Sequence, residues 1–466
     1  MTFWDAVSSL PAIPLLFFFI ALVVAFGFEF INGFHDTANA VTTVIYTRTL
    51  PPTPAVIYSG TMNFLGVLLG GTAVAFGIVN LLPVDLLVDS RSGAALVMVL
   101  SLLVAGVMWN LGTWYVGLPV SSSHTLIGSI LGVGIANGLW TGAGLARVNW
   151  AQVEKVGLAL LISPLIGFLL ACVLLLLMKV VFRSPRLYTP PIGDDRPPGW
   201  IRGVLIGTCG AVSYAHGSND GQKGMGLLLL VLIGFFPLHY ALTVNKPDMA
   251  PDVYKAALQL RTDYEKAGVE VPKKTAENLK VIETELKDVP SFNDLPRDKD
   301  TRWEVRQAIS AVGRDLKKAE TDENLSEELR KKIGKHRKEA FLPAVEYVPL
   351  WVVICTALAL GIGTTIGYKR IVLTVAEKIG KQHLTYGQGA AAETATAVII
   401  ELASQTGLSV STTHVLNSAV AGTMVANRFG VQRATVLKIL LAWVCTLPAC
   451  MLLSGTLFFI GRAIVG

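Results

Sequence analysis

Charged residues are scarce in this sequence of 466 residues. Only 15% are Asp, Glu, Lys or Arg, and 52% are hydrophobic, whereas a soluble protein usually has about a quarter charged residues. About 21 of the 39 Lys and Arg, and about 21 of the 33 Asp and Glu, fall within residues 245–347. The remainder has the composition of a membrane protein. The net charge of +6 gives no reason to expect nucleic acid as a partner.

Two further absences narrow the class. The five cysteines lie in apolar segments without the spacing of metal ligands, so we expect buried hydrophobic side chains and no metal centre of that kind. The start, MTFWDAVSSL, lacks the basic region of a cleavable signal peptide. What recurs instead is apolar runs of about 17–25 residues, long enough to cross a bilayer as helices. They lie at residues 11–31, 56–82, 94–111, 156–182, 348–368 and 436–460.

Two sequence motifs occur twice. GFHDTANA at residues 33–40 resembles GSNDGQKG at 217–224, and GLPVSSSHTLIGSILG at 117–132 resembles GLSVSTTHVLNSAVAG at 407–422. The two copies of the first motif are 184 residues apart, and those of the second motif are 290 residues apart. The charged stretch 245–347 is about as long as the difference between these two spacings. We therefore predict a first membrane repeat at 1–190. The second starts at 191–244, is interrupted by a helical soluble insert at 245–347, and continues at 348–466. Internal repeats are common in transporters, with substrate bound at the repeat interface.

The first motif places Asp36 and Asp220 at equivalent positions in apolar surroundings. A charge at the bilayer centre costs about 2.5–3.5 kcal/mol on insertion scales, so each carboxylate needs a partner. With the amides of Asn39 and Asn219, these carboxylates suit a hard cation such as Na⁺. The alternative is a protonated or salt-bridged structural Asp. Three glycines would let the helices break there and turn carbonyl groups toward an ion: Gly33, Gly217 and Gly221.

The second motif is a doubled cluster of hydroxyl groups. Each copy is followed by an apolar stretch of only about 10–14 residues, which favours re-entrant helical hairpins near residues 117–138 and 407–427. Hairpin tips expose helix N-terminal N–H groups, which together with hydroxyls can hold an oxyanion such as phosphate reversibly. The alternative is that the hydroxyls bond to the carbonyl groups of the preceding turn. The candidate phosphate ligands are Ser121, Ser122, Ser123, Thr125, Ser411, Thr412 and Thr413.

Four further residues are candidates near these motifs. We expect His124 and His414 to brace the tips by hydrogen bonds, with proton coupling as the alternative. Glu393, among small residues before the second tip, is a candidate Na⁺ ligand or else an ordinary interfacial carboxylate. Lys223 could bridge to either aspartate or contact the phosphate, and the sequence leaves both open.

These motifs resemble those of the inorganic phosphate transporter (PiT) family, whose pattern is approximately G-x-N-D-x-x-N-[AS]. His35 replaces the first Asn in one copy, and Lys223 replaces the last Asn in the other. The resemblance covers both membrane halves. It implies an all-α integral membrane protein of two inverted repeats with about ten to twelve membrane helices and two re-entrant hairpins. It also implies a multi-pass protein of the cytoplasmic membrane, a homodimer, a cytoplasmic insert, and Asp36 and Asp220 as essential acidic residues.

The sequence therefore predicts a Na⁺-coupled symporter of inorganic phosphate that works by alternating access and needs no cofactor. Two alternatives stay open within transport: proton coupling, and a permease for sulfate or another oxyanion. A membrane enzyme such as a lipid phosphatase would need a base, a nucleophile or an Arg cluster beside the hydroxyls, and only the two histidines are present. A receptor that signals through the insert is a further alternative, which retention of transport after deletion of the insert would contradict.

Overall fold

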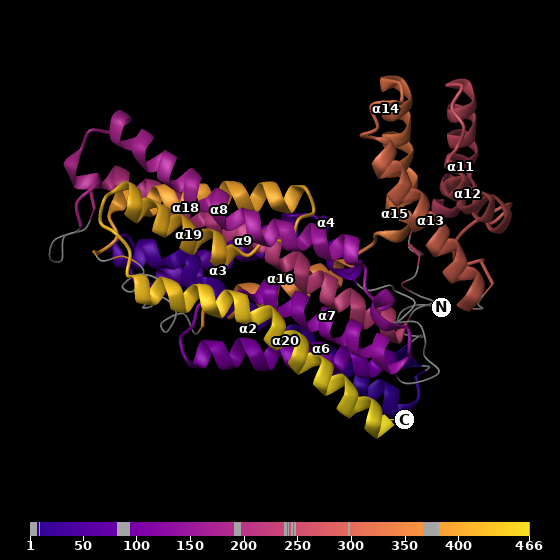
Figure 1. The fold of residues 1–466 in the computed structure, drawn as a ribbon, viewed down its shortest axis with the longest axis horizontal. Coiled ribbons are helices and arrows are strands. Elements are labelled where there is room, and N and C mark those ends of the chain that lie inside the picture. Colours follow the sequence, from indigo (N-terminus) through magenta and orange to yellow (C-terminus); the bar gives the residue numbers. More distant parts are fainter. Residues whose placement is uncertain are drawn as a thin grey trace. The chain divides into compact units, whose positions relative to one another are not determined.

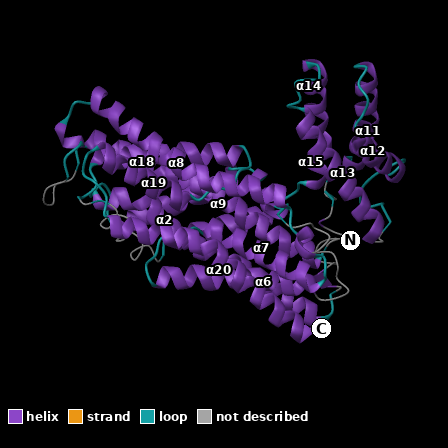
Figure 2. Ribbon diagram, viewed as in Figure 1, coloured by secondary structure: helices purple, strands orange, loops and turns teal. Residues whose placement is uncertain are grey.

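The computed structural model describes residues 7–8, 10–81, 94–190, 197–236, 240, 242–243, 246, 248–296, 299–366, 380 and 382–465, without the side chains of 37–39, 94, 146–147 and 299–300. Within these ranges the chain is helical and has no β-strand beyond one isolated bridge between Gly380 and Val431 (Figure 2). The prediction of an all-α protein is confirmed. The chain divides into two compact units, one of residues 16–231 with 350–466 and one of 1–15 with 232–349.

The first unit consists of helices, labelled in Figure 1, and several of them are strongly apolar. Four described helices are long and apolar enough to cross a membrane: α2, most of α6, α8 and α20. Helices α3 and α4, bent by 78° at the break between them, pass the same test as a pair. The helices of this unit are α2 (Ala12–Tyr46), α3 (Pro52–Leu69), α4 (Ala73–Val79), α6 (Ala94–Tyr115), α7 (Ser122–Trp140), α8 (Trp150–Val181), α9 (Gly199–Phe235), α16 (Leu350–Thr364), α18 (Tyr386–Gln405), α19 (Thr412–Ala426) and α20 (Arg433–Val465), with short 3₁₀ turns at Gly144–Arg147 and Pro185–Leu187.

Corresponding helices of the two sequence repeats pack in a reciprocal pattern. Helix α3 packs against its counterpart α16. Helix α7 packs against α6 and α20, and α19 packs against α18 and α8. Thus α7 of the first predicted repeat contacts α20, the final helix of the second, and α19 of the second contacts α8, the final helix of the first. Glycines allow the close approach: Gly132 of α7 lies against Met451 of α20, and Gly422 of α19 lies against Phe168 of α8. Small residues at such contacts are typical of membrane helices.

The expectation that glycines break the two Asp-bearing helices is wrong. Helix α2 runs without a break through Gly33, and α9 through Gly217 and Gly221. A continuous helix satisfies its own backbone groups, which is the stable arrangement in a bilayer. The glycines serve close helix contacts instead. Gly33 lies against the backbone of α16, and the other two lie against Asn63 and Val67 of α3.

The second unit contains helices with a hydrophobic core of their own. They are α11 (Met249–Lys266), α12 (Lys273–Glu285), α13 (Lys299–Ala319), α14 (Glu327–His336), a π-helical turn (Arg337–Phe341) and α15 (Leu342–Val345). Leu260, Leu279, Ile309 and Phe341 are fully buried in this core. Arg306 is buried as well, and burial lowers the pKa of its guanidinium to about 10. Because it buries this much apolar surface, the region predicted as an insert is a folded helical unit.

Candidate functional site

The two hydroxyl motifs form the same local structure. Gly117 and Gly407 have φ of +71° and +70°, a left-handed conformation that favours glycine at a helix end. Ser121 and Ser411 then cap α7 and α19, each accepting a hydrogen bond from a backbone N–H three residues on at 3.2 Å. We call residues 116–121 and 406–411 the tip loops. Each tip loop ends where a helix N-terminus begins, the arrangement that attracts anions.

The first turn of α7 contacts the second tip loop and the first turn of α19. The Ser123 hydroxyl donates to the Val410 carbonyl oxygen at 2.9 Å. The rings of His124 and His414 lie 4.5 Å apart, and His414 stacks on Trp443 of α20 at 3.8 Å. Among the described residues, His124 Nδ1 and His414 Nε2 have no hydrogen-bond partner. These two ring nitrogens therefore form none of the expected bracing hydrogen bonds, and the rings contribute to the contact by packing.

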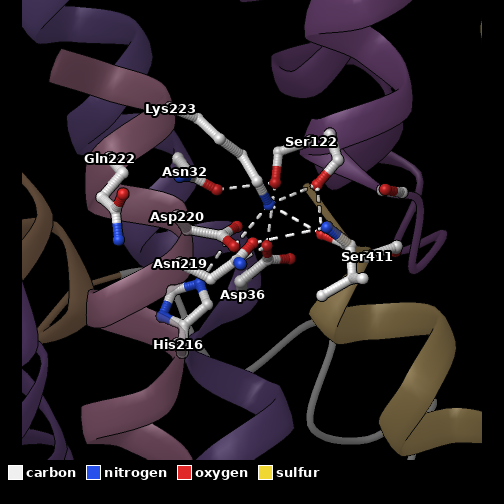
Figure 3. A network of polar contacts seen from close by, with 12 residues as sticks. Asn32, Asp36, Ser122, His216, Asn219, Asp220, Gln222, Lys223 and Ser411 are labelled. Carbon is white, nitrogen blue, oxygen red and sulfur yellow. Dashed lines mark hydrogen bonds and ion pairs between the residues drawn. The ribbon is translucent and has the colours of Figure 1, made fainter. Parts of the chain in front are cut away.

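Asp36 of α2 is buried and contacts α7 and α19, the two helices that follow the tip loops and that we call the tip helices. Figure 3 shows Asp36 beside Ser122 of α7. Asp36 Oδ1 accepts a hydrogen bond from the Thr413 hydroxyl at 2.9 Å and lies 3.3 Å from Nδ1 of His35. The Ser122 hydroxyl has two acceptors within hydrogen-bond distance, which are Asp36 Oδ2 at 2.8 Å and Asn32 Oδ1 at 2.6 Å. This carboxylate therefore has hydroxyl donors from both halves of the chain and no Lys or Arg partner among the described residues.

Asp220 of α9 has a different partner. The Lys223 ammonium group lies 2.6 Å from Asp220 Oδ1, one turn away on the same helix. The same ammonium donates to the Ser123 hydroxyl at 2.6 Å and to the Val410 carbonyl oxygen at 2.8 Å. Of the two partners that the sequence left open for Lys223, the structure therefore shows an aspartate, and all three ammonium protons have protein acceptors.

His216 lies between the two carboxylates. Its Nε2 is 3.6 Å from Asp36 Oδ2 and 3.5 Å from Asp220 Oδ2, and its Nδ1 is 2.9 Å from Asn63 Oδ1. One ligand atom from each of these two aspartates and the histidine lies within 4.8 Å of the others, as a cation site requires. Sequence reasoning missed His216, although its position four residues before Asp220 on one helix places both on the same face.

Of the two asparagines predicted as Na⁺ ligands, the structure describes the side chain of Asn219 only. Asn219 donates to the Leu408 carbonyl oxygen at 3.1 Å and accepts from the Val410 N–H at 3.4 Å, which fixes the second tip loop to α9. The side chain of Asn39 lies outside the described residues. Asn219 therefore positions a tip loop.

Three further candidate residues, Thr125, Thr412 and Glu393, differ in their hydrogen-bond partners. The Thr125 hydroxyl donates to the Ser121 carbonyl oxygen at 3.1 Å, the structural alternative for hydroxyls in helices. The Thr412 hydroxyl is buried without a partner among the described residues. Glu393 accepts hydrogen bonds from Thr43 and Thr208. Thr43 follows Asp36 by seven residues, about 10 Å along α2, so Glu393 contacts α2 at a different level from the aspartates.

The charges of this network set its chemistry. Asp36 and Asp220 bring two negative charges into a buried site and Lys223 one positive charge, and the His216 imidazole between the carboxylates adds a second positive charge when it is protonated. Buried carboxylate oxygens of this kind attract cations. The adjacent helix N-termini attract an anion. The arrangement can therefore hold a cation and an oxyanion close together.

Long apolar helices around a buried polar site of this kind are typical of a membrane transporter. The sequence matches the phosphate transporter family over residues 32–454, and the chain belongs to this family. It is 40% identical to the low-affinity inorganic phosphate transporter PitB of Escherichia coli, with 97% of each chain covered. It is 41% identical to PitA of the same organism, with 96% of each covered. The family match confirms the predicted membership of the PiT family, and these relatives are named as transporters, as predicted for this chain.

A solved structure supports the fold. A protein described as the sodium-dependent phosphate transporter superposes with a TM-score of 0.62 at 18% sequence identity, covering 96% of this chain and 100% of that one. At this identity the likeness concerns the fold alone. The chain also shares 30% identity over 96% of its length with a probable low-affinity inorganic phosphate transporter of Bacillus subtilis, 98% of which is covered.

Proposed function

We propose that the protein carries inorganic phosphate together with Na⁺ across the cytoplasmic membrane by alternating access. The observation that carries this proposal is the contact of Asp36 with Ser122 and Thr413, which joins a buried carboxylate to both tip helices. An anion at the helix N-termini and a cation at the carboxylate would neutralise each other. Binding would then be favourable yet reversible, as transport requires.

Phosphate would bind where the two tip helices begin. The first N–H groups of a helix have no acceptor within it, and Thr412 adds a buried hydroxyl with no partner among the described residues. Several hydroxyls that bond within the protein in this structure would exchange those partners for phosphate oxygens. The proposed phosphate ligands are Ser121, Ser122, Ser123, Thr125, Ser411, Thr412 and Thr413, whereas Lys223 stays paired with Asp220.

Na⁺ would bind between the two aspartates. Asp220 Oδ2 is buried and accepts no hydrogen bond from the described residues, and it faces Asp36 across His216. Carboxylate and amide oxygens suit a hard cation, which supports Asn219 and Asn39 as further ligands. Glu393, with Thr43 and Thr208, would form a separate cation position on the path through the membrane.

The membrane arrangement follows from the repeat. The matched caps at Ser121 and Ser411, and the reciprocal packing of α7 with α20 and α19 with α8, support two inverted repeats with two re-entrant hairpins. Inversion would place the tips at the midplane from opposite faces, where transporters bind their substrates. We further propose ten to twelve membrane helices, a homodimer and a cytoplasmic insert.

One observation favours the alternative of proton coupling. Glu29 of α2 is fully buried, and neither of its carboxyl oxygens has a hydrogen-bond partner among the described residues. It lies against Gly224 of α9, one residue beyond Lys223. A buried carboxyl group without donors is stable as the neutral acid. Phosphate uptake driven by a pH gradient alone would favour this alternative.

The test uses proteoliposomes containing wild-type protein, Asp36→Asn, or the control Glu154→Gln at an exposed carboxylate of α8. We expect a Na⁺ gradient to drive phosphate uptake in wild type and the control, and choline at constant pH to stop it. Asp36→Asn should show no uptake, because it removes the charge that binds Na⁺, while its expression and its elution as a folded protein stay intact. Near-normal Na⁺-dependent uptake by Asp36→Asn would exclude this residue as an essential cation ligand.

A further inference from the structure

The ammonium group of Lys223 has surroundings that a metal cation would have. Its side chain is 3% exposed. Its three acceptors are a carboxylate oxygen of Asp220, which Figure 3 shows beside it, the hydroxyl oxygen of Ser123 and the carbonyl oxygen of Val410, all within 2.8 Å. Carboxylate, carbonyl and hydroxyl oxygens are the ligands of hard cations. An ammonium head group is a compact point charge with three donors, so it satisfies the same oxygens.

The two repeats differ at this position. Asp36 and Asp220 are equivalent, and the residue three positions later is Asn39 in the first copy and Lys223 in the second. An amide provides an oxygen ligand for a cation, whereas the lysine provides the positive charge itself. The repeat that contains Asp220 therefore has a covalently attached cation where the repeat that contains Asp36 has a possible oxygen ligand.

We propose that Lys223 is a tethered cation that fills a cation position beside Asp220, so that this chain moves one fewer mobile cation per phosphate than it would with Asn at this position. The inference rests on the proposed phosphate transport. The ammonium group of Lys223 neutralises one of the negative charges of the two aspartates. With Asn at this position that charge would have no tethered partner, and the vacated oxygens of Asp220, Ser123 and Val410 would form a second cation site.

This assignment also explains why Lys223 does not serve the anion here. Each of its three ammonium protons already has a protein acceptor, so a contact with phosphate would require breaking a short bond to Asp220, Ser123 or Val410. A buried charge separated from its partner is strongly destabilised. The lysine therefore stays with Asp220 while mobile cations bind and leave near Asp36.

The test measures ²²Na⁺ and ³²P-phosphate uptake in the same proteoliposomes. We expect K223N to raise the ratio of Na⁺ to phosphate by one relative to wild type. The ratio should stay at the wild-type value in Lys438→Asn, which removes an exposed lysine from α20. A wild type that moves no Na⁺ should acquire about one Na⁺ per phosphate in K223N.

An unchanged ratio in K223N that still transports phosphate overturns the inference and leaves the proposed function intact. A wild type that transports no phosphate instead removes the proposed function. If K223N is unstable, its folding becomes the readout. The inference requires Na⁺, and not choline, to restore a monodisperse protein, and equal instability in both salts overturns it.

Discussion

Asp36 and Asp220 are equivalent in sequence but have different partners. Asp36 accepts hydrogen bonds from neutral hydroxyls, whereas Asp220 forms an ion pair with Lys223. A carboxylate with neutral donors can exchange a bound cation more readily than one that holds a lysine. The two residues are therefore expected to have different roles, with Asp36 closer to the mobile ion.

A residue-scale prediction concerns Thr412, whose buried hydroxyl has no partner in the described part of the chain. Thr412→Val keeps the side-chain shape and removes the hydroxyl. A lost hydrogen bond to a charged group costs about 1.5–3 kcal/mol, so the apparent KM for phosphate should rise by about tenfold or more. Initial rates of labelled phosphate uptake measure this.

The matched control is Ser129→Ala, which removes another buried, unpartnered hydroxyl deeper in α7. It should leave the KM unchanged. Equal constants for wild type and Thr412→Val would remove this hydroxyl from the phosphate site.

Local spacing accounts for part of this site and not for the rest. The pair of Lys223 with Asp220 is three residues apart on one helix, so it could be anticipated from sequence. The bond from Ser123 to Val410 joins positions 287 residues apart, and only the fold determines it. The same holds for Glu393, whose contacts with Thr43 and Thr208 depend on how α18 packs.

At the scale of helices, reciprocal packing requires glycine at two corresponding positions. A Cβ atom at Gly132 would collide with the Met451 carbonyl oxygen of α20, and one at Gly422 with the Phe168 carbonyl oxygen of α8. A backbone atom cannot move aside as a side chain does, so the helices would have to separate.

Gly132→Ala and Gly422→Ala should each therefore destabilise the protein by about 1–3 kcal/mol. Thermal unfolding in detergent, followed by the monodisperse fraction in gel filtration, measures this effect. Gly112→Ala in α6 is the control, because nothing lies within 4 Å of its added Cβ. If all three variants melt at the same temperature, these contacts are looser than the structure indicates.

The long membrane helices followed from the length of the apolar runs, because this signal is local. The sequence did not predict that α2 and α9 are continuous helices. Gly33, Gly217 and Gly221 read as breaks because glycine disfavours helix, yet neighbouring helices use their missing side chains for close contact. Sequence alone does not distinguish these two uses of glycine.

At the scale of the whole molecule, the second unit has its own core, and transport is assigned to residues of the first. Phe341→Ala should destabilise the second unit by about 3–5 kcal/mol and leave phosphate uptake near wild type. Hydrogen exchange of α11 and α13 measures the first effect, and proteoliposome uptake the second.

Leu258→Ala is the control for this prediction, since Leu258 is 43% exposed in α11, and it should change neither quantity. A fall in uptake that accompanies the loss of exchange protection in Phe341→Ala would show that the second unit supports transport.

The packing of α7 on α20 has a consequence for biosynthesis. The ribosome makes α20 about 300 residues after α7, so the glycine-bearing face of α7 stays without this partner while the intervening residues are made. Nascent chains that stop before residue 433 should expose this face to the insertion machinery and to quality-control proteases. The contact between α7 and α20 therefore forms after α7 has been inserted into the membrane.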